Sequence, residues 1–156
     1  MPSKPSWTRE VSGLIDTNVL LYAANRDAPE NGAARAFLVG TARTADPWYV
    51  SEGILYEFLR VATHPKVFPQ PLTWREGLDF LMPLVEADNV RVLHADEGHW
   101  GLLAQVLAEL THPSGNLFFD VRTVVLMREH GIRRIYTTDT DFLQFSGIEV
   151  VNPLRG

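Results

Sequence analysis

Short apolar runs alternate with longer helical patterns along the chain, and this alternation constrains the fold more than any other feature of the sequence. The runs favour buried strands and span residues 11–16, 48–50, 90–93, 134–138 and 148–151. Helical patterns span residues 17–24, 29–40, 51–63, 73–87, 96–110 and 116–130, with a short helical turn at 140–145. Strands that alternate with helices form parallel sheets, because each parallel connection must cross back over the sheet. We therefore predict an α/β protein of three layers, with a central parallel β-sheet flanked by helices.

Several helix boundaries carry local signals. Ser51 is placed to cap the helix at 51–63, and the sequence TWRE at 73–76 matches a capping box at the start of the next helix. Pro83 is expected to kink that helix or end it early, because proline has no amide proton to donate. Asp96 is a candidate N-cap for the helix at 96–110, and Gly131 suits the position just after the helix at 116–130.

The chain has the length of one domain, which we place at residues 11–156 after an N-terminal arm at residues 1–10. Its 156 residues are close to the usual size of a single domain. The absence of cysteine excludes disulfides, thiolate nucleophiles and cysteine-based zinc sites. The sequence shows no secretory signal and no apolar run near the ~20 residues that would span a bilayer. We therefore expect a cytoplasmic protein with no membrane partner.

Two aspartates stand at the ends of predicted strands. Asp16 follows the first apolar run, and Asp139 follows the run at 134–138. In open α/β sheets the functional site lies outside the carboxyl ends of the strands. The predicted fold therefore makes both aspartates candidate site residues. Each aspartate alone could equally cap the helix or turn that comes after it.

Two further carboxylates lie on predicted helices. Glu57 stands at the edge of the apolar stripe of its helix, where its carboxylate would reach water or pair with Arg60. Asp120 lies on a helix that is apolar nearly all round, so the helix should be largely buried. A carboxylate in such a place is costly unless it is paired or binds metal. The alternatives for Asp120 are therefore a salt bridge, for example to Arg122, or a metal site.

The combination of these acids is more informative than any one of them. If they and Asp141 converge from separate elements, their mutual repulsion would be severe without cations. Clusters of carboxylate oxygens suit Mg²⁺ or Mn²⁺ rather than zinc, and such ions support the hydrolysis of phosphodiester bonds. The formal net charge of −5 does not exclude a nuclease, because bound metal neutralises the acids of its site.

Four segments, in this order and spacing, resemble the motifs of the PIN-domain family. They are IDTNVLLYA at 15–23, YEFLRVATHP at 56–65, GNLFFDVRTVVLMREHG at 115–131 and TTDTDF at 137–142. The resemblance runs from about residue 11 to residue 154. Each motif alone is weak or moderate, whereas all four in order are a strong signal.

The resemblance implies a PIN-like fold and a metal-dependent endoribonuclease. It implies that the catalytic and metal-binding cluster is formed by Asp16, Glu57, Asp120 and Asp139. Asp141 would be an additional metal ligand, and Asn18 and Thr137 would orient the cluster. Within the family, a chain of this length is most similar to the VapC toxins of type II toxin–antitoxin systems. This implies RNA as substrate, a homodimer and a VapB-like antitoxin as partner.

One departure from the family pattern leaves two alternatives open. Small residues usually follow the third acid, whereas Val121, Arg122 and Thr123 follow it here. Arg122 would contact RNA phosphate or pair with Asp120. A catalytically silent RNA-binding or regulatory module with the same fold, and a phosphohydrolase acting on a small phosphate ester, are the competing interpretations. The sequence does not rank the candidates for phosphate contact, which are Arg35, Arg43, Arg60, Lys66 and Arg122.

Overall fold

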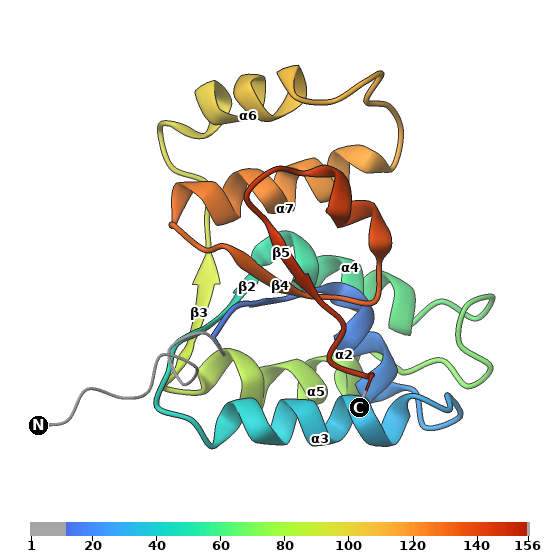
Figure 1. Cartoon of the computed structure of the whole chain (residues 1–156). Coiled ribbons are helices and arrows are strands. Elements are labelled where there is room, and N and C mark those ends of the chain that lie inside the picture. Colours follow the sequence, from blue (N-terminus) through green and yellow to red (C-terminus); the bar gives the residue numbers. More distant parts are fainter. Residues whose placement is uncertain (1–11, 156) are drawn as a thin grey trace, which may run out of the picture.

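A computed structural model describes residues 12–155 of the chain as a single parallel sheet with helices on both faces (Figure 1). The five strands lie in the order β3-β2-β1-β4-β5, and every pair is parallel. Their bounds are β1 Leu14–Ile15, β2 Trp48–Ser51, β3 Val90–Leu93, β4 Arg134–Tyr136 and β5 Glu149–Val151. The predicted arm, residues 1–10, lies outside the described residues.

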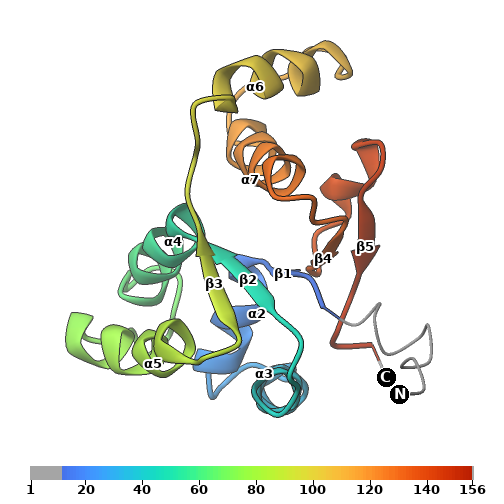
Figure 2. The same cartoon turned by 90° about the vertical axis from the view of Figure 1, so that its left-hand side faces the viewer.

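Helices cover both faces of the sheet, which confirms the three-layer α/β prediction. In Figure 1, α3 and α5 lie on one side of the sheet, and α6 and α7 stack on the other. Figure 2 shows the same layers from the side of β3. The bounds are α2 Thr17–Ala24, α3 Asn31–Ala42, α4 Glu52–Ala62, α5 Trp74–Glu86, α6 His99–Ala108 and α7 Leu117–Glu129, with a 3₁₀ helix, η1, at Thr140–Gln144.

The central strand β1 is the most deeply enclosed part of the sheet. Leu14 and Ile15 have no exposed surface, because β2 and β4 flank the strand and helices cover it. Phe37, Trp48 and Tyr136 pack as an aromatic cluster, with ring centroids 4.9–5.6 Å apart. Apolar burial of this kind is the main favourable term in folding, and here it fixes the position of the residue that follows β1.

Several local signals in the sequence are confirmed. Ser51 caps α4, and the capping box at the start of α5 is present. Of the two alternatives for Pro83, the early end of the helix is wrong, since α5 continues through it to Glu86. Asp96 is not the N-cap of α6: the helix begins later, Gly98 is its N-cap, and the Asp96 carboxylate accepts a hydrogen bond from the Gly98 amide instead.

The strand order reverses between β1 and β4. The chain builds the sheet outward from β1 to β2 and β3, and then returns to add β4 and β5 on the other side of β1. Such a switch point leaves a crevice at the carboxyl ends of the two neighbouring strands, where ligands bind in open α/β sheets. Among residues 12–155, no helix is long and apolar enough to cross a membrane.

Candidate metal centre

Asp16 comes directly after β1 and is held by three hydrogen-bond donors. Its side chain caps α2 by accepting a bond of 2.8 Å from the Thr17 amide. Its Oδ2 also accepts from the Thr137 hydroxyl at 2.8 Å and from the Asn18 side-chain amide at 3.1 Å. The sequence left open whether Asp16 caps a helix or belongs to a site. The structure shows that it caps the helix and faces the other acids at the same time.

Asn18 and Thr137 link the ends of the two strands at the switch point. The Asn18 amide donates to the Thr137 hydroxyl at 2.9 Å, and its Oδ1 accepts from the Thr138 amide at 3.1 Å. Thr137 is 1% exposed, and its Oγ1 accepts from the Asp139 amide at 3.0 Å. The segment after β1 and the segment after β4 are therefore connected by side-chain bonds as well as by strand pairing.

Three aspartates gather beside this link. Carboxylate oxygens of Asp120, Asp139 and Asp141 lie within 4.8 Å of one another. Asp139 caps η1 by accepting a bond of 2.8 Å from the Asp141 amide, and this turn carries both residues toward α7. Asp120 lies in the first turn of α7 and is only partly buried. The helix is buried at Val121 and from Thr123 to Met127, whereas Phe118 and Phe119 in its first turn are exposed, so the predicted burial holds for only part of it.

Glu57 approaches from the opposite wall of the site, on α4. Its Oε1 lies 3.7 Å from Nη2 of Arg60, which is the pairing that the sequence suggested. The Thr17 hydroxyl donates to its Oε2 at 3.5 Å. The sequence did not suggest this contact, because the two residues come from different elements and nothing local marks it. The structure thus brings all five predicted acids to one place.

Burial, together with the negative charge of neighbouring acids, raises the pKa of two of these acids. Burial raises the pKa of Asp16 from 3.8 to about 6, although its hydrogen bonds to Thr137 and Thr17 act in the other direction. Burial also raises the pKa of Asp120 to about 7, and the negative charges of its four acidic neighbours add to the effect. At neutral pH the site therefore carries negative charge that is unfavourable without a cation.

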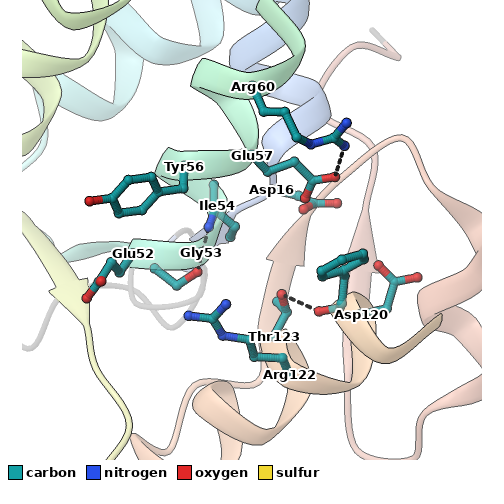
Figure 3. Close-up of a pocket in the computed structure, with 12 residues that line it drawn as sticks. Asp16, Glu52, Gly53, Ile54, Tyr56, Glu57, Arg60, Asp120, Arg122 and Thr123 are labelled. Carbon is teal, nitrogen blue, oxygen red and sulfur yellow. Dashed lines mark hydrogen bonds and ion pairs between the residues drawn. The ribbon is translucent and has the colours of Figure 1, made fainter. Parts of the chain in front are cut away.

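A pocket of about 410 Å³ opens between α4 and α7 (Figure 3). Asp16, Glu57 and Asp120 lie in its wall. The donor set fits a hard divalent cation, because it consists of carboxylate oxygens with hydroxyl and amide groups behind them. The carboxylate oxygens of Asp120, Asp139 and Asp141 are close enough together to hold one cation. The negative charges of Asp16 and Glu57 also act on Asp120.

The fold and the site together define an α/β protein with a cluster of carboxylates at its topological switch point. The chain belongs to the PIN-domain family, whose model matches residues 13–148. It is similar to Ribonuclease VapC48 of Mycobacterium tuberculosis, with 33% identity over 94% of this chain and 100% of the relative. It is also similar to Ribonuclease VapC24 of the same species, with 35% identity over 90% of this chain and 95% of the relative.

Solved structures show the same fold at low sequence identity. The crystal structure of VapC20 from Mycobacterium tuberculosis, a toxin that cleaves the sarcin–ricin loop, matches with a TM-score of 0.62 and 19% identity over 87% of this chain and 98% of that one. VapBC2 from Rickettsia felis, bound to a DNA fragment from its promoter, matches with a TM-score of 0.64 and 15% identity over 89% of this chain and 96% of that one. These matches confirm the predicted fold.

Proposed function

We propose that this chain is a metal-dependent endoribonuclease and the toxin of a type II toxin–antitoxin pair. The observation that carries the proposal is the convergence of five carboxylates at the β1–β4 switch point, where the pKa values of Asp16 and Asp120 are raised. The family membership and the VapC ribonuclease relatives support the same activity. In a catalytically silent binding module, the mutual repulsion of these carboxylates would cost stability without serving a reaction.

In this proposal Mg²⁺ or Mn²⁺ is held by the acidic cluster. The metal ligands are Asp16, Glu57, Asp120 and Asp139, with Asp141 as an additional ligand. When bound, the ion lowers the pKa of a coordinated water and neutralises charge on the phosphate oxygens. Asn18 and Thr137 hold the Asp16 carboxylate in one orientation through the bonds described above, and Arg60 limits the positions open to Glu57.

The proposed partners follow from the relatives. VapBC2 of Rickettsia felis and FitAB, a further structural match with 21% identity and a TM-score of 0.62, were both solved with DNA fragments. We propose that this chain likewise pairs with a small VapB-like antitoxin that suppresses its activity, that it forms a homodimer, and that it acts in the cytoplasm. Purification of the chain alone and with the protein encoded beside it, followed by light scattering, would test the first two proposals.

Cleavage of RNA by the purified protein tests the activity itself. Total, transfer and ribosomal RNA would be incubated with the protein in Mg²⁺, in Mn²⁺ and in EDTA, and a chromogenic phosphate ester would serve as a second substrate. We expect discrete RNA fragments that need metal, and no hydrolysis of the small ester. RNA binding without cleavage of any RNA, by folded protein free of antitoxin, would favour the silent module instead.

Metal binding should weaken as the pH falls. The pKa values of Asp16 and Asp120, about 6 and about 7, place protons on both carboxyls in mildly acidic solution, and a cation must displace those protons. Titration calorimetry with Mn²⁺ in buffers of different ionisation enthalpy should therefore show proton release near pH 6. It should show almost none near pH 8.5, with a higher affinity there. Equal affinity and no proton release at the lower pH would contradict the assignment of these two acids.

A further inference from the structure

The pocket that contains the acids also contains one cation with no partner among residues 12–155. Its wall includes two basic residues, Arg60 and Arg122. Arg60 is paired with Glu57, and Glu52, another acid of the wall, has its Oε2 3.2 Å from Nδ1 of His94. Arg122 is exposed and makes no hydrogen bond or ion pair with any residue between 12 and 155. In particular, the pairing with Asp120 that the sequence left open does not form within this part of the chain.

The guanidinium of Arg122 lies against the backbone of α4 at Gly53. A Cβ atom at that position would stand 2.8 Å from Cζ and Nη1 of Arg122 and 3.2 Å from Nη2. Figure 3 shows the Arg122 side chain extending from α7 toward Gly53 across the pocket. Any larger residue at this position would collide with the guanidinium, so Gly53 leaves the space that Arg122 occupies.

Two exposed aromatic rings line the same pocket. Tyr56 on α4 is 68% exposed, and Phe119 on α7 is 58% exposed. Large apolar side chains in such positions offer stacking surfaces to unpaired bases, whereas paired bases inside a duplex keep their faces covered. The pocket therefore combines acids, a guanidinium that is unpaired within the described part of the chain, and two aromatic faces. Together these features match one segment of single-stranded nucleic acid.

We propose that Arg122, seated over Gly53, binds a backbone phosphate of single-stranded RNA beside the acidic cluster, and that Tyr56 and Phe119 stack on the flanking unpaired bases. This inference rests on the proposed ribonuclease function and names the residues that would contact the RNA. An arginine suits the role because its planar fork can donate two parallel hydrogen bonds to one phosphate. It also places positive charge in the wall beside the acids of the pocket.

RNA binding, measured separately from cleavage, tests the proposal. The probe is a fluorescein-labelled single-stranded RNA of about ten nucleotides, within the range of site sizes for single-strand binders, and binding is followed by anisotropy in Mg²⁺ at several salt concentrations. Asp120→Asn serves as the parent so that the RNA stays intact. Arg122→Gln should weaken binding about tenfold, because a charge-assisted contact is lost. It should also lower the slope of log affinity against log salt by about 0.7, the value for one phosphate on a single strand.

Two further variants separate phosphate binding from a structural role. Arg122→Lys should keep the salt slope while binding more weakly, because the charge remains but the fork is lost. Gly53→Ala should weaken binding by displacing the guanidinium, and it should have no further effect in the Arg122→Gln background, since the two residues act as one unit. Arg133→Gln, at an exposed arginine before β4 and outside the pocket, is the matched control and should bind like the parent.

Several results would overturn the proposal. Unchanged affinity and slope in Arg122→Gln would remove the phosphate contact, and an equal effect of Gly53→Ala in both backgrounds would break its link to Arg122. Equally tight binding of the duplex form of the same RNA would exclude the stacking of unpaired bases. If the wild-type chain cleaves RNA with metal in any of these cases, the ribonuclease function stands and only this inference fails. If it neither cleaves nor binds RNA, both fail.

Discussion

Replacement of Asp120 by Asn should lower the rate of metal-dependent RNA cleavage about a thousandfold, because a cation at the site contributes several kcal/mol and each ~1.4 kcal/mol is tenfold in rate. The same substitution should make the metal-free protein more stable near pH 8. The pKa of Asp120 in the folded protein, about 7, lies above its ordinary value of 3.8. Folding therefore disfavours the ionised form, and this cost appears as the pH rises from about 4 through 7. Asparagine removes it.

The gain in stability should be small, because Asp120 is only partly buried and solvent screens its charge. An increase on the order of 1 kcal/mol corresponds to about 2–4 °C in Tm for a chain of this size. Single-turnover cleavage assays and thermal melts in EDTA would measure the two effects. Asp79→Asn, at an exposed aspartate on α5, is the control and should change neither. Lost activity with an unchanged or lower Tm would mean that Asp120 has another partner in the fold.

Replacement of Thr137 by Val should weaken metal binding about 10- to 100-fold, the usual effect of losing a group that orients a ligand. Valine keeps the shape of threonine, so the core around it remains filled. The variant loses the hydroxyl that donates to Asp16 and accepts from Asn18 and from the Asp139 amide. The Asp139 amide then loses the hydroxyl it donates to, and Asp16 and Asn18 each lose one bond while keeping the bond between them. The free energy of unfolding should therefore also fall by about 1–3 kcal/mol.

Thr137→Ser is the matched variant, because it keeps the hydroxyl and loses only a methyl group. It should retain most of the metal affinity, as measured by calorimetry with Mn²⁺, and most of the cleavage at saturating metal. A serine variant that fails as badly as the valine variant would show that the methyl group, and hence packing, is what Thr137 contributes. Near-normal metal affinity in the valine variant would show that Asp16 needs no such support.

The sequence pointed to these acids in two ways. Asp16 and Asp139 were candidates because each follows an apolar run, and sites of open α/β sheets lie at strand ends. Asp120 was a candidate because its helix is apolar nearly all round. The full set, with Glu57 and Asp141, came from the resemblance to the PIN-domain family. The pairing of β1 with β4, which brings Asp16 close to Asp139, depends on strand order and was not predicted.

Contacts between elements were beyond the reach of the sequence. The contact between the Arg122 guanidinium and Gly53 depends on how α7 lies relative to α4. In the sequence, a glycine near the start of a predicted helix was the one sign of this contact. The start of α6 was also misjudged, because Asp96 satisfies the Gly98 amide in the turn before the helix instead of capping the helix itself. Pro83 was expected to disrupt α5, yet it falls near the end of the helix, which continues to Glu86.

The position of β1 between β2 and β4 has a consequence for synthesis of the chain. Asp16 and Glu57 are translated first, and Thr137, Asp139 and Asp141 come at least 80 residues after Glu57. Until β4 has left the ribosome and paired with β1, Asp16 lacks the Thr137 hydroxyl, and Asp120 lacks both aspartates that stand within 4.8 Å of it. On the proposed assignment of ligands, a nascent chain that stops before β4 holds no complete cation site. A ribosome that makes this chain is thus not exposed to the proposed nuclease activity until β4 and η1 have emerged and folded.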